Sequence, residues 1–206
     1  MAISTPSDIL EYWFIDSARD ALKAKERLDF WFRATPEHDR EIAQRFSATL
    51  EAAADGSLSH WETEPHAALA LVIVLDQFPR NIHRATPAAF AYDAEALSVA
   101  RHGVGAGYLR GLTTIEQGFF VMPYQHCEDL TCQRESVALS ERITNDAAPE
   151  WRLLAEGMLH YARLHLELIE RFGRFPHRNA ILGRTSTPAE IEFLRTNSES
   201  FGQSAR

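Results

Sequence analysis

Lysine is nearly absent from this chain of 206 residues, and so is any surplus of positive charge. The 21 basic residues include only two lysines, Lys23 and Lys25, and the formal net charge at pH 7 is −8. A general nucleic-acid binder needs a surplus of positive side chains for its phosphate contacts. The composition therefore excludes that class of protein, and it requires any anion-binding site to be local.

Cysteine is limited to Cys127 and Cys132, both of which we expect in one helix. Five helical steps place them about 140° apart around the helix axis. Side chains that diverge this far cannot form a disulfide. The pair therefore predicts a reduced protein located in the cytoplasm.

Long apolar segments are missing as well. The longest apolar run, residues 67–75, is too short to span a bilayer, which takes about 20 apolar residues in a helix. The chain begins MAISTPSDILEYWF, with Asp8 and Glu11 and without a basic region, so we expect no signal peptide. We therefore predict no membrane partner.

Strand signals are nearly absent, because no alternating run of β-branched residues is bounded by a hairpin turn. Helix-start signals recur instead. Threonine caps free backbone amides, proline tolerates the first helical position, and a glutamate three residues after the threonine completes a capping box. The Thr-Pro pairs begin at Thr5, Thr35, Thr86 and Thr187, and the boxes are Thr113 with Glu116 and Thr187 with Glu190.

Apolar residues at helical spacing predict a chain of antiparallel helices joined by short loops. Residues 65–77 are apolar on every side, so this helix should be central and buried. We expect helices to end at Pro79, Gly103 and Pro123. The expected helices cover residues 6–16, 36–54, 65–77, 87–102, 114–122, 124–143, 149–172 and 188–196, with a charged link after the first. The sequence predicts one all-α domain over residues 1–206, an antiparallel helix bundle or array whose tail, 197–206, is frayed.

Two stretches of the chain contain the same residue types in the same order. Residues 76–84 read DQFPRNIHR, and residues 165–184 read HLELIERFGRFPHRNAILGR. In each, a Phe-Pro dipeptide ends a helix, and arginine and asparagine follow where the backbone turns. Because arginine binds carboxylate and phosphate bidentately, we interpret the segments as walls of one site in which Arg80 and Arg178 reach a shared anion. The ligand-binding candidates are Arg80, Asn81, Arg84, Arg174, His177, Arg178 and Asn179.

A third polar cluster lies at residues 119–133, which read FFVMPYQHCEDLTCQ. On one continuous helix, His126, Asp129 and Gln133 share a face, while Glu128 lies well round the helix from His126. A carboxylate beside an imidazole fixes its tautomer, and the two together can move a proton. The alternative is a structural pair, or an Asp129 that faces water.

His165 has the apolar neighbours Ala162 and Ile169 at helical spacing, so its side chain should point inward. It is either a satisfied core residue or, if His126 faces it from the adjacent helix, one half of an acid/base pair. Nucleophilic catalysis has little support, because no serine lies in an elbow motif and Cys127 has no special neighbour besides His126. The candidate catalytic residues are His126, His165, Glu128 and Asp129.

Two alternatives for these polar residues stay open. Structural ion networks imitate active sites, and the arginines could lock helix ends by pairing with Asp76, Glu128, Asp129 or Glu170. The histidines and carboxylates could instead hold a metal, although no HExxH or CxxC spacing supports this. Its ligands would be drawn from His126, Glu128, Asp129, His165 and His177. We expect no metal and no cofactor.

Four motifs, in this order, resemble a known family. They are LDQFPRNIHR, AFAYDAEAL, FFVMPYQHCED and RFGRFPHRNAILGRTSTPAE. The chain resembles the bacterial domain of unknown function 924 family over nearly its whole length, from Ile9 to Leu194. The resemblance implies an all-α fold grouped with the tetratricopeptide-like helical superfamily, and it implies no established activity.

The leading hypothesis is a cytoplasmic all-α protein with a polar cleft that binds, and could transform, a small anionic ligand. One alternative is a helical module that binds a peptide along a concave face. Another is a metal-dependent hydrolase. Charged residues that converge in one place would favour the small ligand, and residues spread along a groove would favour the peptide.

Overall fold

The computed structural model describes residues 2–33 and 35–196, and within those ranges it contains helices and turns but no strand. The all-α prediction is confirmed. The α-helices are α1 (Pro6–Phe14), α2 (Ala21–Glu26), α3 (Leu28–Phe32), α4 (Pro36–Ala54), α5 (Pro65–Val72), α6 (Phe78–Ile82), α7 (Asp93–Ala106), α8 (Thr114–His126), α9 (Leu130–Asp146), α10 (Arg152–Phe172) and α11 (Pro188–Thr196). Short 3-10 turns cover Ile15–Ala18, Ser59–Thr63, Pro87–Phe90, Tyr108–Gly111, Pro149–Trp151 and Pro176–Arg178. The predicted frayed tail, 197–206, lies outside the described residues.

The threonine caps form as their sequence pattern predicts. Thr5 and Thr35 cap α1 and α4 with proline in the next position, and Thr113 forms a capping box with Glu116 at the start of α8. The Thr187 amide likewise donates to Glu190 Oε2 over 2.6 Å. Thr86 differs, because it begins a 3-10 turn without a side-chain cap.

The helix ends were predicted less well, and all three expected stops are wrong. Pro79 is the second residue of α6, so it does not end the helix. A π-helical turn, Ile73–Gln77, joins α5 to α6 without leaving helical backbone. Pro123 lies inside α8, which ends at His126.

Gly103 also lies inside a helix, for a steric reason. A Cβ atom at this position would come within 2.3 Å of Phe120 Cζ, so glycine lets α7 approach α8 closely. The end of α7 is marked instead by Gly107, which has a φ of 81° and so adopts the left-handed backbone that glycine favours. The charged link after α1 is also helical, since Asp20 caps α2 through the Leu22 and Lys23 amides.

An aromatic core occupies the N-terminal body of the molecule. Phe78 is fully buried, and its ring lies 4.8 Å from that of Phe46 and 5.8 Å from that of Trp13. The helix expected to be central is buried, with Leu71 and Leu75 each 3% exposed. The core holds residues from α1 through to α10.

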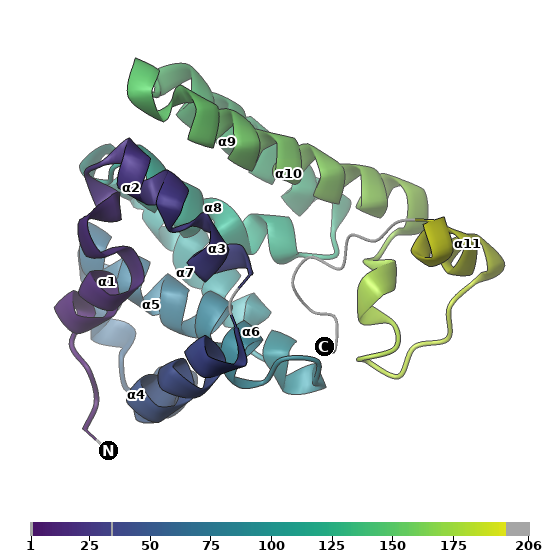
Figure 1. Ribbon diagram of the computed structural model, residues 1–206, viewed down its shortest axis with the longest axis horizontal. Helices are drawn as coiled ribbons and strands as arrows, with labels where there is room; N and C mark the ends of the chain where they lie inside the picture. Colours follow the sequence, from purple (N-terminus) through teal and green to yellow (C-terminus); the bar gives the residue numbers. More distant parts are fainter. Residues whose placement is uncertain (1, 34, 197–206) are drawn as a thin grey trace.

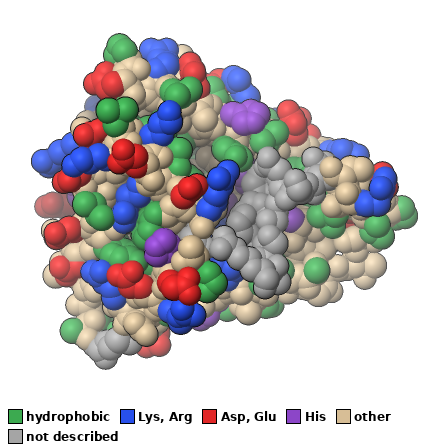
Figure 2. Space-filling view, viewed as in Figure 1, with side chains coloured by type: hydrophobic (Ala, Val, Ile, Leu, Met, Phe, Trp, Pro, Cys, Tyr) green, Lys and Arg blue, Asp and Glu red, His purple; other side chains and the backbone are tan. Residues whose placement is uncertain are grey.

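Helices α9 and α10 lie side by side along one edge of the molecule, and α11 stands beside the C-terminal end of α10 (Figure 1). There a second, smaller apolar cluster contains Leu168, Ile169 and Phe175. Basic and acidic side chains are interspersed across the face in Figure 2. Among the described residues, no helix is long and apolar enough to cross a membrane.

Candidate functional site

Asp76 is a fully buried carboxylate in the π-helical turn between α5 and α6. His126 Nδ1 lies 2.6 Å from Asp76 Oδ1, Gln77 Nε2 lies 2.5 Å from Oδ2, and Arg80 Nη1 lies 3.3 Å from Oδ1. Burial raises the pKa of Asp76, but the positive charge of Arg80 and the hydrogen bonds from His126 and Gln77 outweigh it and bring the pKa to about 2. Asp76 is therefore ionised at neutral pH and accepts the Nδ1–H of His126.

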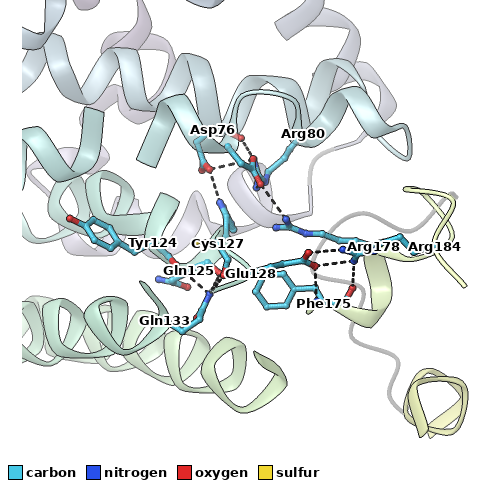
Figure 3. Close-up of polar contacts among 12 residues, drawn as sticks. Asp76, Arg80, Tyr124, Gln125, Cys127, Glu128, Gln133, Phe175, Arg178 and Arg184 are labelled. Carbon is cyan, nitrogen blue, oxygen red and sulfur yellow. Dashed lines mark hydrogen bonds and ion pairs between the residues drawn. The ribbon is translucent and has the colours of Figure 1, made fainter. Parts of the chain in front are cut away.

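His126 is the last residue of α8, and the helix end is held by a side chain from α9. Gln133 Nε2 donates to the carbonyl oxygens of Gln125 and Cys127, at 2.7 Å each, and of Tyr124 at 3.3 Å (Figure 3). These contacts satisfy carbonyls that a helix end leaves without partners. They fix the backbone on both sides of His126.

The imidazole of His126 is neutral in the folded protein. Burial lowers its pKa and the positive charge of Arg80 lowers it further, against the opposing effect of Asp76. Because Nδ1 carries the proton that binds Asp76, Nε2 is left as a hydrogen-bond acceptor. The side chain keeps 14% of its surface exposed.

A second carboxylate, Asp93 at the start of α7, joins the two Phe-Pro segments. Arg80 Nη1 lies 2.8 Å from Asp93 Oδ1, and Arg178 Nη1 lies 3.2 Å from Oδ2. The predicted meeting of the two segments is therefore confirmed. The anion that they share in this structure is a side chain of the protein itself.

The guanidinium of Arg178 contacts two aromatic rings. Its Cζ lies 4.4 Å from the centre of the Phe90 ring and 4.8 Å from that of Phe175. The residue is only 6% exposed, and its buried Nε–H has no hydrogen-bond partner among the described residues. Burial lowers the pKa of Arg178 to about 10 despite the opposing charge of Asp93.

The fully buried ring of Phe175 gathers two histidines beside Arg178. The rings of His165 and His177 lie 5.4 Å and 5.5 Å from it, and the rings of His165 and His126 are 6.3 Å apart. Burial, with the positive charge of Arg178, lowers the pKa of His165 and of His177 to about 3 each. We call His126, His165, His177 and Arg178 the histidine–arginine cluster.

His165 confirms the prediction that it points inward, since it is 7% exposed. Its Nδ1 lies 2.8 Å from the Tyr161 carbonyl oxygen, which must accept the proton of that nitrogen. His165 therefore has a fixed tautomer, as His126 does. The structure brings the two predicted acid/base candidates together, on α8 and α10.

Glu128 fastens the second Phe-Pro segment to the end of α8. It accepts hydrogen bonds from both Nη atoms of Arg184, at 2.5 and 2.9 Å, and from the Phe175 amide at 2.7 Å (Figure 3). Arg184 also donates to the Phe175 carbonyl over 3.1 Å. Glu128 thus positions the Phe175 ring rather than facing His126.

The expectation that His126 and Asp129 share one helix face is wrong. The chain leaves helical backbone between α8 and α9, because Asp129 adopts an extended conformation and caps α9 by accepting from the Cys132 amide over 2.9 Å. Asp129 is exposed. The carboxylate beside His126 is Asp76, which comes from a different helix pair.

The break between α8 and α9 also shows that the expectation of both cysteines in one helix is wrong. Cys127 is the residue after α8 and Cys132 lies in the first turn of α9, so they do not share a helix. Cys132 Sγ lies 3.7 Å from the Tyr124 carbonyl oxygen. Both are free cysteines.

Several candidate arginines and asparagines pair away from the histidines. Asp39 accepts from Arg84 Nε and Nη2 at 2.7 Å each and from Asn81 Nδ2 at 2.9 Å. Arg174 donates to both oxygens of Glu190, at 2.7 and 2.9 Å. The interpretation that arginines lock helix ends therefore describes Arg84 and Arg174, although with other carboxylates than expected. It also describes Arg80 with Asp76 and Arg184 with Glu128, which are expected partners.

Asn179 is buried within the second segment. Its Nδ2 donates to Ser186 Oγ over 3.0 Å, and its Oδ1 accepts from Arg184 Nε over 2.9 Å. It supports the turn that carries His177 and Arg178. Its counterpart Asn81 has a carboxylate partner instead.

Sequence reasoning missed two residues that organise the site, Asp93 and Phe90, and it named Asp76 only as an arginine partner and not as the carboxylate beside His126. One signal was available for Asp76, since a carboxylate directly after nine apolar residues, 67–75, belongs to a buried helix and needs buried partners. Nothing local marks Asp93 or Phe90. Within residues 2–33 and 35–196, no group of three or more His, Cys, Asp or Glu side chains could hold a metal ion.

The fold and site define an all-α protein in which a buried carboxylate–histidine pair lies beside ion-paired arginines. The chain belongs to the family described as bacterial protein of unknown function (DUF924), whose profile matches residues 9–198. It is also similar to the structure of the protein of unknown function ATU0120 from Agrobacterium tumefaciens, with 32% identity and a TM-score of 0.79 over 93% of this chain and 97% of that chain. No curated protein matches. The resemblance inferred from the four motifs is confirmed.

Proposed function

We propose that the protein binds a small anionic ligand, a carboxylate or a phosphate, at the histidine–arginine cluster. The observation that carries the proposal is the buried Nε–H of Arg178, which has no hydrogen-bond partner among the described residues. A buried donor of a charged group is costly to leave unpaired. An anion beside Arg178 would supply the missing acceptor.

The electrostatics of the cluster support the same ligand. Arg178 and the histidines each lower the pKa of their neighbours, and Asp93 does not fully offset the burial of Arg178. A bound anion would stabilise the protonated forms of His165 and His177 and raise both pKa values. Binding in acid solution, close to these pKa values, should therefore be accompanied by proton uptake.

The local backbone also supports a binding site. Asp76 lies in a π-helical turn, a feature that often marks functional sites. Arg80, Arg178 and His126 converge on the adjacent carboxylates Asp76 and Asp93. Convergence of this kind favours a small ligand over an extended peptide.

The Asp76–His126 pair favours one catalytic role within this proposal. Since Asp76 fixes the proton on Nδ1, Nε2 of His126 would act as the general base toward a hydroxyl group or water of the ligand. Ring 15N chemical shifts of His126 should report the Nδ1–H tautomer, and Asp76→Asn should abolish that preference. An unchanged tautomer in Asp76→Asn would remove the argument for a base.

Thermal unfolding with added anions tests the binding proposal. Phosphate, or a carboxylate such as citrate, should raise the unfolding temperature of the wild type more than chloride at matched ionic strength. Arg178→Lys keeps the charge but loses the Nε–H fork, so it should lose this response. Arg163→Lys, in a surface pair with Glu141, should keep it.

Two results would contradict the proposal. One is a wild type that no phosphate or carboxylate stabilises beyond chloride. The other is an Arg178→Lys variant that responds as the wild type does, since the anion would then bind elsewhere. A variant that loses stability but retains the full response would show that Arg178 is a structural residue.

A further inference from the structure

The ring of His126 offers one nitrogen to a ligand. Asp76 Oδ1 lies 2.6 Å from Nδ1 and accepts its proton, so Nε2 of the neutral ring is an unprotonated acceptor. None of the described residues donates a hydrogen bond to Nε2, and 14% of the side chain is exposed. A ligand can therefore reach this acceptor.

The neighbouring histidine cannot supply a donor to it. The ring centres of His126 and His165 are 6.3 Å apart. Nδ1 of His165 donates its proton to the Tyr161 carbonyl oxygen over 2.8 Å, so Nε2 of His165 is unprotonated as well. Two acceptors form no hydrogen bond with one another, so the donor to His126 must come from outside this pair of rings.

The arginines of the site donate to other acceptors. Arg80 Nη1 donates to the Asp76 carbonyl oxygen over 2.6 Å, and Arg80 Nη2 donates to Asp93 Oδ2 over 3.0 Å. Arg178 Nη1 donates to the same Asp93 oxygen over 3.2 Å. These hydrogen bonds leave Nε2 of His126 to water or to a ligand.

His126 and Arg178 belong to one connected set of short contacts. Arg80 Nη1 lies 3.3 Å from Asp76 Oδ1 and 2.8 Å from Asp93 Oδ1. Asp76 in turn contacts His126, and Asp93 contacts Arg178. Arg80 and Arg178 point toward one another in Figure 3. A ligand whose anionic group binds Arg178 therefore lies close to His126.

We propose that the anion at the histidine–arginine cluster carries a hydroxyl group that donates to Nε2 of His126, an inference that rests on the proposed anion site. The ligand class is a hydroxycarboxylate or a phosphate monoester of a polyol. A ligand that enters the cluster displaces water from Nε2, and an acceptor that loses water without gaining a donor costs free energy. A hydroxyl close to the anionic group restores that hydrogen bond.

The electrostatics favour a hydroxyl over a protonated amine as the donor. Burial and the positive charges of the arginines lower the pKa of His126, and also of His165 and His177. The cluster thus keeps its own imidazoles neutral beside Arg80 and Arg178. An ammonium group would add a further positive charge here, whereas a hydroxyl donates a hydrogen bond without one.

Matched ligands that differ by one hydroxyl test the inference on the wild type at neutral pH. In titration calorimetry, the better of lactate and 3-hydroxypropanoate should have a dissociation constant about tenfold or more below that of propanoate. A site with a hydrogen-bonding group discriminates against a ligand that lacks the partner group. 2-Hydroxyethyl phosphate should bind more tightly than ethyl phosphate by a similar factor, and the two series show which anionic group is preferred.

The variant His126→Phe keeps a ring at this position and removes the acceptor. Because Arg178 is unchanged, the variant should still bind the anions, but with equal affinity for the hydroxylated and the hydroxyl-free ligands. His160→Phe makes the same substitution at an exposed position of α10. This control should keep the wild-type preference.

The ring 15N signals of the wild type give a readout that needs no variant. Lactate or 2-hydroxyethyl phosphate should move the Nε2 signal of His126, because accepting a hydrogen bond changes the shielding of that nitrogen. Propanoate and ethyl phosphate should move it less. Hydroxylated ligands that bind and leave this signal unchanged would refute the assigned acceptor.

The binding results separate this inference from the proposed function. Equal affinities for the hydroxylated and hydroxyl-free ligands in the wild type would overturn the inference and leave the anion site in place. A hydroxyl preference that persists in folded His126→Phe would also overturn it, since the hydroxyl would then bind another residue. If none of the ligands binds, the proposed function fails together with the inference.

Discussion

The two Phe-Pro segments start from the same residue types and reach the same carboxylate by different backbones. Phe78 and Phe175 are both fully buried, and Arg80 and Arg178 both bind Asp93. The first segment is helical from Asp76 through Ile82, whereas the second follows a helix end at Gly173 and forms a 3-10 turn. Similar residue sequences therefore do not specify the same backbone conformation. Both segments nevertheless place an arginine side chain at Asp93.

The rings of the two segments also have different neighbours. Phe78 packs against Phe46 and Trp13 in the aromatic core, whereas Phe175 packs against His165 and His177. The first segment should accordingly contribute mostly to stability, and the second should also control the protonation of histidines. This difference can be tested by substitution.

The largest expected effect is that of Phe78→Ala. Removing a fully buried ring from the core should lower the free energy of unfolding by about 3–5 kcal/mol. Chemical denaturation measures this loss, with Leu153→Ala, which removes an exposed side chain (68% exposed), as the control that should change little. A loss below about 1 kcal/mol would show that the segment is not part of the core.

Asp93→Asn should break the link between the segments. Two arginines would lose their shared carboxylate, and we expect a loss of about 2–3 kcal/mol, less than for a fully buried pair because Asp93 keeps 18% of its side chain exposed. Added acetate should recover part of the stability by replacing the missing carboxylate. Glu141→Gln, which breaks a surface pair, is the matched control. Equal stability of both variants would mean that Asp93 does not hold the segments together.

The second segment should also give the protein a distinctive pH dependence. His165 and His177 have folded-state pKa values of about 3, below the ordinary 6.5. Between these limits the unfolded chain binds more protons, so the free energy of unfolding should fall as the pH drops below about 6.5, by at most about 1.4 kcal/mol per pH unit for each histidine.

Denaturation between pH 7 and pH 5 separates this effect from that of Asp76, whose pKa of about 2 affects stability only at lower pH. His177→Gln should make the dependence shallower, while His66→Gln, at an exposed position, should not. A wild type whose stability is flat over this range would contradict the assigned burial of the histidines.

The sequence predicted the helices well and their junctions poorly. The threonine caps at Thr5, Thr35 and Thr113 are local signals and were interpreted correctly. Pro79 and Gly103 were misread because their roles depend on contacts with other helices, such as the ring of Phe120 against α7. Local patterns specify where a helix can begin, while packing decides whether it continues.

The sequence predicted which residues lie in the candidate site better than it predicted which residues they contact. His165 and the meeting of Arg80 with Arg178 could be inferred, because inward histidines and charged turns follow from helical spacing. The pairing of His126 with Asp76 rather than Asp129 could not, since it depends on the break between α8 and α9. The convergence on Asp93 depends on how α6, α7 and the turn Pro176–Arg178 pack, which no local pattern encodes.

The smallest expected effect concerns Arg174, which sequence spacing places with the ligand-binding residues. Because it binds both oxygens of Glu190, Arg174→Gln should leave the response of the unfolding temperature to added anions unchanged. The same measurement on Arg178→Lys should show a loss. A loss in Arg174→Gln as well would extend the binding site toward α11.

The central claim is that the histidine–arginine cluster takes up an anion, and the ring 15N signals of His165 and His177 test it most directly. In the free protein both rings should stay neutral down to acid pH, since their pKa values are about 3. Saturating phosphate or citrate should raise both pKa values by about one unit or more, which corresponds to at least about 1.4 kcal/mol of interaction. Titration curves that coincide with and without these anions would contradict the claim.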